Sequence, residues 1–363
     1  MKLIFTSYAS SPDYNQPDLW LKRIEGYTGI LENLGRTNTV IGIERINYKG
    51  ECERNGVQYL FIRLNRKIVR FPFRMHGLIK KLKPDVVFIN GFIFPLQIIQ
   101  LRMTLGSSVK IIVLHRAEKP FNGIKRYLQK IADNAVDAYL FTALEFGSDW
   151  KRNINVKKIY EVIQASSNFR PMNKSAAREK TNVNGDPIFL WVGTLIPRKD
   201  PLTVVKAFLE FSVHQPMAKL YMIFQSATLL EEIELLLNKN QQYRDNIILV
   251  GSIPHDQLLY WYNSADFFIS ASHYEGSGVA LSEAMSCGCI PITSDFISSK
   301  KMTGPGKCGL LFRTGDARDL LSALLTTKKM DKREEQEKVV HQFNKELSFE
   351  AIVSKINNVI SSI

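Results

Sequence analysis

Short apolar runs rich in β-branched and aromatic residues recur along this chain of 363 residues, and segments with helical spacing of apolar residues separate them. The runs are continuous rather than alternating, as expected for strands that are buried on both faces of a parallel sheet. Strand followed by helix, repeated many times, predicts βαβ units in a doubly wound α/β layer. The predicted strands are 2–8, 38–43, 59–63, 85–90, 110–115, 138–142, 159–163, 188–193, 219–224, 246–251, 266–272, 289–294 and 309–312.

A polar stretch rich in Asn, Gly and Pro interrupts this pattern and predicts a linker at 171–187. We therefore expect an N-terminal Rossmann-like domain at 1–170 and a second one at 188–345. The last helical segment, 346–363, is expected to cross back to the first domain. Two such domains would face a shared cleft, because open α/β sheets bind ligands beyond the carboxyl ends of their strands.

The net charge of +13 lies entirely in the first half of the chain, since residues 1–170 hold 27 basic and 14 acidic side chains and residues 171–363 hold 21 of each. Such asymmetry favours an anionic partner, either nucleic acid or a membrane surface. We expect no nucleic-acid partner, because no nucleic-acid-binding motif accompanies the charge.

Residues 54–84 contain no acidic side chain, and their cations alternate with apolar residues. A basic helix of this kind suits an anionic membrane surface, but an ordinary helix packed on the sheet would have a similar pattern. The residues predicted to form a membrane or acceptor surface are Arg66, Lys67, Arg70, Arg74, Lys80 and Lys81.

The four cysteines are too few and too scattered for a disulfide framework, and no His or Cys residues stand at zinc spacing. The apolar run at the N-terminus is shorter than a signal peptide requires, and no run reaches the roughly 20 residues of a membrane span. These features predict a cytoplasmic protein that is peripheral at the inner face of the membrane.

The segment 275–288 follows one predicted strand and precedes another. Its glycines, Gly276 and Gly278, allow close backbone approach to a ligand, and a helix starting near Val279 offers amides to an anion. Glu283 within that helix needs hydrogen-bond donors if it is buried, and ribose hydroxyls would supply them. A capping loop with a solvated Glu283 is the alternative.

Three other sites stand at strand ends. Gly193 begins a turn in which Arg198 and Lys199 either neutralise a diphosphate or are simply solvated. Amides near Ser252 and Ile253 contact a base edge or form an ordinary turn. His115 ends the strand 110–115 and is either a structural residue or part of an active site.

Taken together, these motifs resemble the C-terminal half of the retaining GT-B glycosyltransferases of family 4, also called glycosyl transferases group 1. Glu275 and Glu283 match that family's Glu-x7-Glu element, and Gly193 to Lys199 match its Gly-x-Leu-x-x-x-Lys turn. The resemblance covers residues 187–325 closely and the first half loosely. It implies the GT-B fold, with two Rossmann-like domains facing a cleft.

The resemblance implies that Glu283 binds the ribose of a nucleotide-sugar donor, that Glu275 contacts the donor sugar, and that Lys199 holds the departing diphosphate. The implied catalytic residues are His115, Lys199 and Glu275. The implied donor-binding residues are Gly193, Thr194, Arg198, Lys199, Ser252, Ile253, Glu275, Gly276, Ser277, Gly278, Val279 and Glu283.

The implied reaction is retaining transfer of a sugar from a nucleotide-diphosphate donor to a hydroxyl of a saccharide or lipid-linked saccharide, with no metal and no cofactor. Thr194 stands where the family usually has Arg, and the first loop, 10–16, lacks the family's glycines. A non-catalytic nucleotide-sugar or glycan-binding protein and a sugar-nucleotide epimerase of the same fold are the alternatives.

Overall fold

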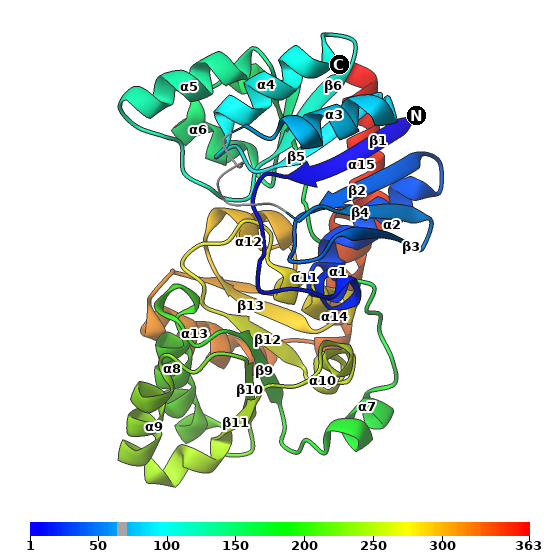
Figure 1. Cartoon of the computed structure of the whole chain (residues 1–363). Coiled ribbons are helices and arrows are strands. Elements are labelled where there is room, and N and C mark those ends of the chain that lie inside the picture. The colour runs from blue at the N-terminus through cyan, green and yellow to red at the C-terminus, as the bar shows by residue number, and fades with distance from the viewer. Residues whose placement is uncertain (64–70) are drawn as a thin grey trace. The chain divides into compact units, whose positions relative to one another are not determined.

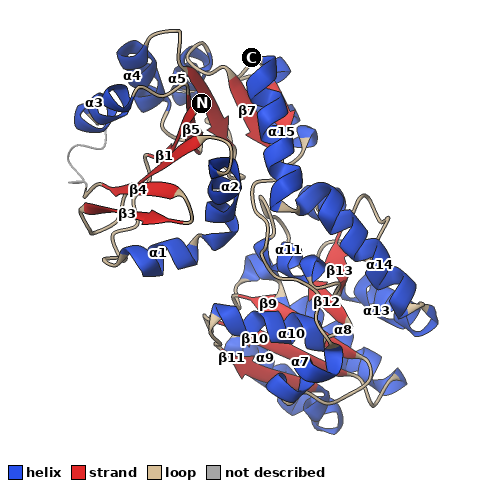
Figure 2. Ribbon diagram, turned by 90° about the vertical axis from the view of Figure 1, so that its right-hand side faces the viewer, coloured by secondary structure: helices blue, strands red, loops and turns tan. Residues whose placement is uncertain are grey.

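The computed structural model describes residues 1–63 and 71–363, and the chain forms two units (Figure 1). Unit 1 comprises Met1–Ser166 with Phe349–Ile363, and unit 2 comprises Ser167–Ser348. Each unit has a sheet of parallel strands, apart from one edge strand of unit 1, with helices on both faces (Figure 2), which confirms the predicted fold class.

The sheet of unit 1 has eight strands in the order β3-β4-β2-β1-β5-β6-β7-β8, and only β3 runs antiparallel to its neighbour. The strands are β1 (Lys2–Ser7), β2 (Thr39–Glu44), β3 (Gly50–Arg54), β4 (Val57–Phe61), β5 (Val86–Asn90), β6 (Lys110–Leu114), β7 (Ala138–Phe141) and β8 (Ile159–Glu161). Their side chains form a core of branched and aromatic residues that is almost fully buried.

Helices α3, α4 and α5 lie on one face of this sheet, and α2 and α15 lie on the other (Figure 2). The helices of unit 1 are α1 (Pro17–Arg23), α2 (Glu25–Gly35), α3 (Phe73–Leu82), α4 (Pro95–Leu105), α5 (Ile124–Asp133), α6 (Gly147–Trp150) and α15 (Phe349–Ser362). The last helix packs on α2, where a side chain at Gly29 would overlap the ring of Phe349. This contact explains why the C-terminal segment belongs to unit 1.

Unit 2 has a six-stranded sheet in the order β11-β10-β9-β12-β13-β14, and all of its strands are parallel. The strands are β9 (Ile188–Gly193), β10 (Lys219–Phe224), β11 (Ile247–Gly251), β12 (Phe267–Ser270), β13 (Ile290–Ser294) and β14 (Leu310–Phe312). Because they are parallel, the loops that follow β9, β11, β12 and β13 all leave the same edge of the sheet.

Helices α8, α9 and α13 cover one face of this sheet, and α7, α10, α11 and α14 cover the other (Figure 1). The helices of unit 2 are α7 (Lys174–Thr181), α8 (Pro201–His214), α9 (Leu230–Lys239), α10 (Leu258–Ser264), α11 (Val279–Ser286), α12 (Ile297–Met302), α13 (Ala317–Thr326) and α14 (Lys332–Gln342). In the core on the α8 face, the ring of Phe189 stacks on Phe267 and meets Phe208 edge-on.

The structure differs from the predicted elements at three places. Strand β3 was not predicted, because its residues alternate and Glu51 and Glu53 point to solvent, which is typical of a sheet edge. Residues 19–34, in which the helical spacing of apolar residues indicates one helix, are divided between two helices at Ile24, whose backbone leaves the helical region. The stretch 171–187, expected to be a linker, contains α7 and is a packed part of unit 2.

Candidate functional site

An ion pair joins the loop after β9 to the loop after β12 in unit 2. The Lys199 ammonium donates to Glu275 Oε1, and the Ser272 hydroxyl donates to the same oxygen over 2.7 Å. The two charged side chains are only 18% and 12% exposed, so their charges are largely removed from water. The sequence predicted both residues as site residues, and the structure places them in direct contact.

Further bonds hold these two loops together. The guanidinium of Arg198 donates to the Tyr274 carbonyl over 3.0 Å, and the His273 amide donates to the Arg198 carbonyl over 2.9 Å. The His273 ring lies 2.9 Å from the carboxylate of Asp200, which also caps helix α8. Sequence analysis missed His273 and Asp200, although each lies within two residues of a predicted site residue.

The loop that carries Glu275 leads into the N-terminus of α11. A Cβ atom at Gly278 would lie 3.3 Å from Glu275 Oε2, so a side chain there would crowd the carboxylate in its present position. The first hydrogen bond of the helix joins the Ser282 amide to the Gly278 carbonyl. The preceding amides therefore point out of the helix end, where the helix dipole favours an anion.

The other predicted donor residues lie at the same edge of the sheet. Gly193 ends β9, and a Cβ atom there would lie 3.0 Å from the Trp191 ring, so packing against this ring favours glycine whether or not a ligand binds. Thr194, the residue after it, is half-buried. Ser252 and Ile253 follow β11, whose last residue, Gly251, has a φ of 82° that favours glycine.

Glu283 on α11 is buried, with 4% of its surface exposed, and its carboxylate is held by the protein itself. The Tyr262 hydroxyl donates to Oε2 over 2.9 Å, and His255 Nε2 lies 2.6 Å from Oε1. Burial, and then the negative charge of Glu283, raise the pKa of Tyr262, so this hydroxyl keeps its proton. The ring of Phe169 stacks on His255 with their centroids 5.3 Å apart.

The solvated Glu283 that was one alternative from the sequence is therefore excluded. Sequence analysis missed Tyr262 and His255 as partners of this carboxylate. A buried glutamate in a helix requires hydrogen-bond donors. The signal available in the sequence was that His255 and Tyr262, which can donate, stand before strand β12.

His115 lies in unit 1 just after β6 and is buried among aromatic rings. Its ring stacks on Phe141 at 4.1 Å and meets Trp150 edge-on at 5.6 Å. Nε2 lies 3.1 Å from the Glu118 carbonyl, and because a carbonyl only accepts, the proton sits on Nε2. Burial lowers the pKa of His115, so the imidazole is neutral near neutral pH.

A polar cluster that sequence analysis did not single out adjoins His115. Arg116 donates to Asn90 Oδ1 over 2.8 Å and lies 4.9 Å above the Tyr27 ring. The carboxylate of Glu118 accepts from the amides of Arg116 and Phe92, both over 2.6 Å. Asn90 ends β5 and Arg116 follows the neighbouring parallel strand β6, so the order of the strands in the sheet brings the two residues together.

The predicted membrane residues have different positions. Arg74, Lys80 and Lys81 are exposed on α3, while the apolar residues Met75 and Ile79 of that helix are buried in the core of unit 1. Arg66, Lys67 and Arg70 lie outside the described residues.

None of the helices in the described part of the chain is both long and apolar enough to cross a bilayer. Within residues 1–63 and 71–363, no three His, Cys, Asp or Glu side chains gather as ligands for a metal ion.

Comparison with known proteins identifies the part of the chain that carries the Lys199–Glu275 pair. Residues 173–343 match the family described as Glycosyl transferases group 1. This part of the chain is a glycosyl transferases group 1 domain. The chain is 27% identical over 166 residues to a D-inositol 3-phosphate glycosyltransferase of Nocardia farcinica, which covers 43% of this chain and 37% of that protein.

The chain is also similar to the O-antigen chain mannosyltransferase B of Escherichia coli, with 28% identity over 134 residues, which covers 37% of this chain and 34% of the relative. The matches thus span about a third of each of these two relatives.

Solved structures resemble the whole chain. A glycosyltransferase of Rickettsia africae superposes with a TM-score of 0.79 at 16% identity, over 99% of this chain and 98% of that one. The Anabaena protein HepE, solved in complex with UDP, superposes with a TM-score of 0.77 at 12% identity over the full length of both chains. At these identities the likeness establishes the fold, which is that of the GT-B glycosyltransferases.

Proposed function

We propose that the protein is a retaining glycosyltransferase that moves a sugar from a nucleotide-diphosphate donor to a hydroxyl of a saccharide or lipid-linked saccharide. The observation that carries the proposal is the Lys199–Glu275 pair beside the N-terminus of α11. It combines a cation and outward amides, which suit a diphosphate, with a carboxylate that can accept sugar hydroxyls. Thr194 and the glycine-free loop 10–16 favour the non-catalytic alternative, whereas the Lys199–Glu275 pair favours catalysis. The epimerase alternative has no observation of its own in its favour.

Lys199 stabilises the departing diphosphate in this mechanism. Negative charge develops on the leaving oxygens in the transition state, and a fixed cation in a site that excludes water lowers the barrier most effectively there. The pair with Glu275 and the neighbouring Ser272 hydroxyl keep the ammonium in place before the donor binds. Transfer is proposed to need no added metal, because Lys199, Arg198 and the helix amides supply the positive charge.

Glu283 binds the ribose in this proposal. A carboxylate has about four lone-pair positions, and Tyr262 and His255 occupy one on each oxygen. The remaining positions accept ribose hydroxyls, while the two protein donors fix the direction of the carboxylate. The complex of HepE with UDP supports a uridine diphosphate donor as the first candidate.

Unit 1 binds the acceptor in this proposal, and His115 is its proposed catalytic residue. The named curated relatives act on an inositol phosphate and on an O-antigen chain, which supports a saccharide acceptor. The excess positive charge of residues 1–170 supports a cytoplasmic enzyme that meets a lipid-linked acceptor at an anionic membrane.

Thermal melting against UDP-, GDP-, ADP- and dTDP-sugars in the presence of EDTA tests the donor site. A sugar nucleotide at 100 times its dissociation constant stabilises the domain by about 2.7 kcal/mol. Glu283→Ala is expected to abolish the shift. Lys199→Ala is expected to lower kcat by about a hundredfold or more, while the exposed Lys206→Ala on α8 serves as its matched control.

Product analysis tests the reaction. NMR of the product is expected to show the same anomeric configuration as the donor. Unchanged kinetics in both Glu283→Ala and Lys199→Ala would remove the donor-site assignment, and an inverted product would remove the retaining mechanism.

A further inference from the structure

Helix α5 of unit 1 presents an apolar stripe to solvent. Ile124, Tyr127, Leu128 and Ile131 are exposed by 87%, 57%, 40% and 55%. They stand at positions i, i+3, i+4 and i+7, which is the spacing of one helix face. A face of this kind normally packs on the protein core, so its exposure requires an explanation.

The opposite side of α5 packs through polar contacts. Gln129 is fully buried, and its amide donates to the Phe92 carbonyl over 2.9 Å. Its carbonyl oxygen accepts from Asn153 over 2.7 Å and from the Phe121 amide over 2.9 Å. Because Gln129 and the small Ala132 fill the packed side, the helix is anchored without any residue of the apolar stripe.

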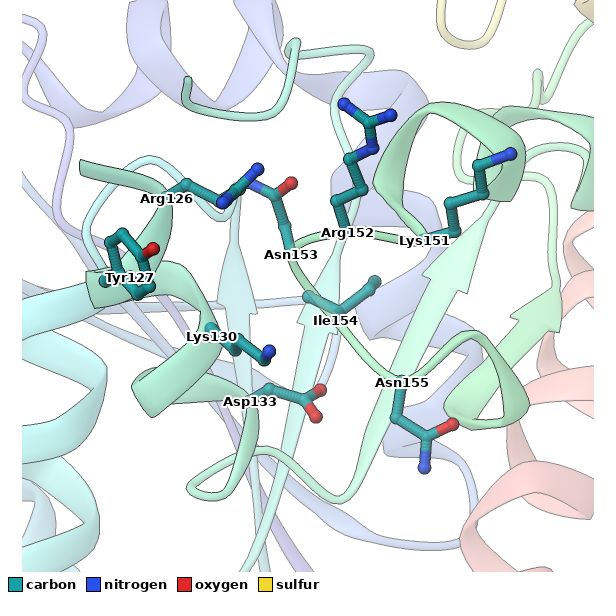
Figure 3. A pocket seen from close by; sticks show the side chains of 9 residues that line it. All are labelled: Arg126, Tyr127, Lys130, Asp133, Lys151, Arg152, Asn153, Ile154 and Asn155. Carbon is teal, nitrogen blue, oxygen red and sulfur yellow. The ribbon is translucent and has the colours of Figure 1, made fainter. Parts of the chain in front are cut away.

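Cations border the stripe. At about 100° per residue, Lys130 lies just beyond one edge of the stripe and Lys125 lies just beyond the other, while Arg126 lies further round the helix on the side of Lys130. Arg126 and Lys130 reach from α5 toward the segment 151–155, and together they enclose a hollow of about 490 Å³ (Figure 3). This basic hollow is lined by Arg126, Tyr127, Lys130, Asp133, Lys151, Arg152, Asn153, Ile154 and Asn155.

The basic hollow keeps its net positive charge. Four of its nine lining residues are Lys or Arg, and Asp133 is the one carboxylate among them. Asp133 already interacts with the Lys158 ammonium, 3.7 Å away, and accepts from the Tyr139 hydroxyl over 3.0 Å. An external anion therefore meets uncompensated cations beside exposed apolar side chains.

We propose that α5 is an interfacial helix that lies in the surface of an anionic membrane. Ile124 and Ile131 enter the boundary of the acyl chains, and the basic hollow receives lipid phosphate groups. Charge complementarity favours this occupant over a second copy of the chain. In a symmetric dimer the same patch faces itself, which would bring the cations of the hollow against each other.

Co-sedimentation with vesicles tests the proposal on the full-length protein. The vesicles contain phosphatidylcholine with about a third phosphatidylglycerol, or phosphatidylcholine alone, at physiological salt, at which surface charge still attracts cations. The expected result is binding to the anionic vesicles only. Ile124→Ser with Ile131→Ser is expected to weaken that binding at least tenfold, and Lys130→Glu with Arg152→Glu is expected to do the same.

Met103→Ser on α4 is the matched control, because Met103 is an apolar residue with 80% exposure that is not part of the stripe. It is expected to bind vesicles as the wild type does. In Tyr127→Trp, the emission of the new tryptophan, taken as the difference from the wild type, is expected to shift to shorter wavelength on anionic vesicles. This shift would report insertion of the stripe directly.

Two results would overturn the proposal. One is wild-type protein that stays in the supernatant with both vesicle types, and the other is a stripe variant that binds as well as the wild type. Analytical ultracentrifugation without lipid tests the rival occupant, a second copy of the chain. If the wild type is a dimer and the stripe variant is a monomer, the stripe is a dimer interface. None of these measurements contains a sugar nucleotide, so their failure is separate from failure of the proposed reaction.

Discussion

Glu44 at the end of β2 is expected to make unit 1 less stable as the pH rises from 4.5 to 7. The side chain is buried, and the Trp20 ring nitrogen donates to its Oε2 over 2.9 Å. Burial raises the pKa of Glu44 from 4.5 to about 7, although the Trp20 hydrogen bond and the charge of Arg116 act in the opposite direction. Its carboxyl group therefore stays protonated in the folded protein at a pH where it ionises in the unfolded chain.

The direction of the effect follows from proton binding. Between pH 4.5 and 7 the folded state binds more protons at this group than the unfolded state, so the free energy of unfolding falls as the pH rises. The contribution is fully present below the unfolded pKa and is lost as the pH passes through the folded one. The difference of roughly 2.5 pKa units corresponds to roughly 3 kcal/mol.

Glu44→Gln tests this value. The amide oxygen still accepts from Trp20, but the side chain no longer ionises. Urea unfolding followed by fluorescence is expected to show similar midpoints for the two proteins near pH 4.5 and a variant more stable by up to roughly 3 kcal/mol at pH 8. Glu51→Gln, at an exposed carboxylate on β3, is the matched control and is expected to change neither value. Parallel curves for wild type and Glu44→Gln across this range would refute the reasoning.

Two further variants probe unit 2. Burial acts to raise the pKa of Asp266, but the charge of Lys174, 2.7 Å away, holds this pKa below its ordinary value. Asp266→Asn is therefore expected to lower the free energy of unfolding by roughly 2 kcal/mol at pH 7. In urea unfolding this loss is expected to become smaller as the pH falls through the pKa that Asp266 has in the folded protein. An unchanged midpoint at pH 7 would contradict this. Gly278→Ala is expected to displace Glu275 and weaken donor binding in calorimetry with little change in melting temperature, because its φ of −70° suits alanine. Gly77→Ala, with no atom within 4 Å, is the control, and equal donor affinity in both variants would contradict the steric argument.

The fold could be predicted where burial dictates the sequence. Strands with both faces covered must be apolar along their whole length, so β1, β5, β6 and β9 were predicted within one or two residues. Edge strand β3 has one half-buried side and one exposed side that carries its glutamates, so it lacks the continuous apolar run by which the other strands were predicted. Helix α7 was not predicted for a related reason. Only one of its residues, Ala177, is buried, and ion pairs with Asp266 hold the helix in place.

The candidate site could be predicted in part. Glycines and charged residues after parallel strands marked Lys199 and Glu275, because loops at one sheet edge meet in space. Their direct contact and the bond between His273 and Asp200 depend on loop conformations that no periodic pattern encodes. For Glu283, the sequence showed that a buried carboxylate needs donors but not that Tyr262 and His255 of the same unit provide them.

Helices α3 and α5 show why a pattern of cations among apolar residues does not by itself locate an interaction surface. In α3, Met75 and Ile79 pack into the core, whereas Phe73 and the cations Arg74, Lys80 and Lys81 are exposed. In α5 three hydrogen bonds to Gln129 provide the contact with the protein, which leaves Ile124 and Ile131 outside. A buried glutamine is stable only when its amide is fully paired, so the partners from Phe92, Phe121 and Asn153 determine which side of α5 faces inward. Those partners come from three separate segments, and for this reason the outward apolar stripe becomes evident only in the folded structure.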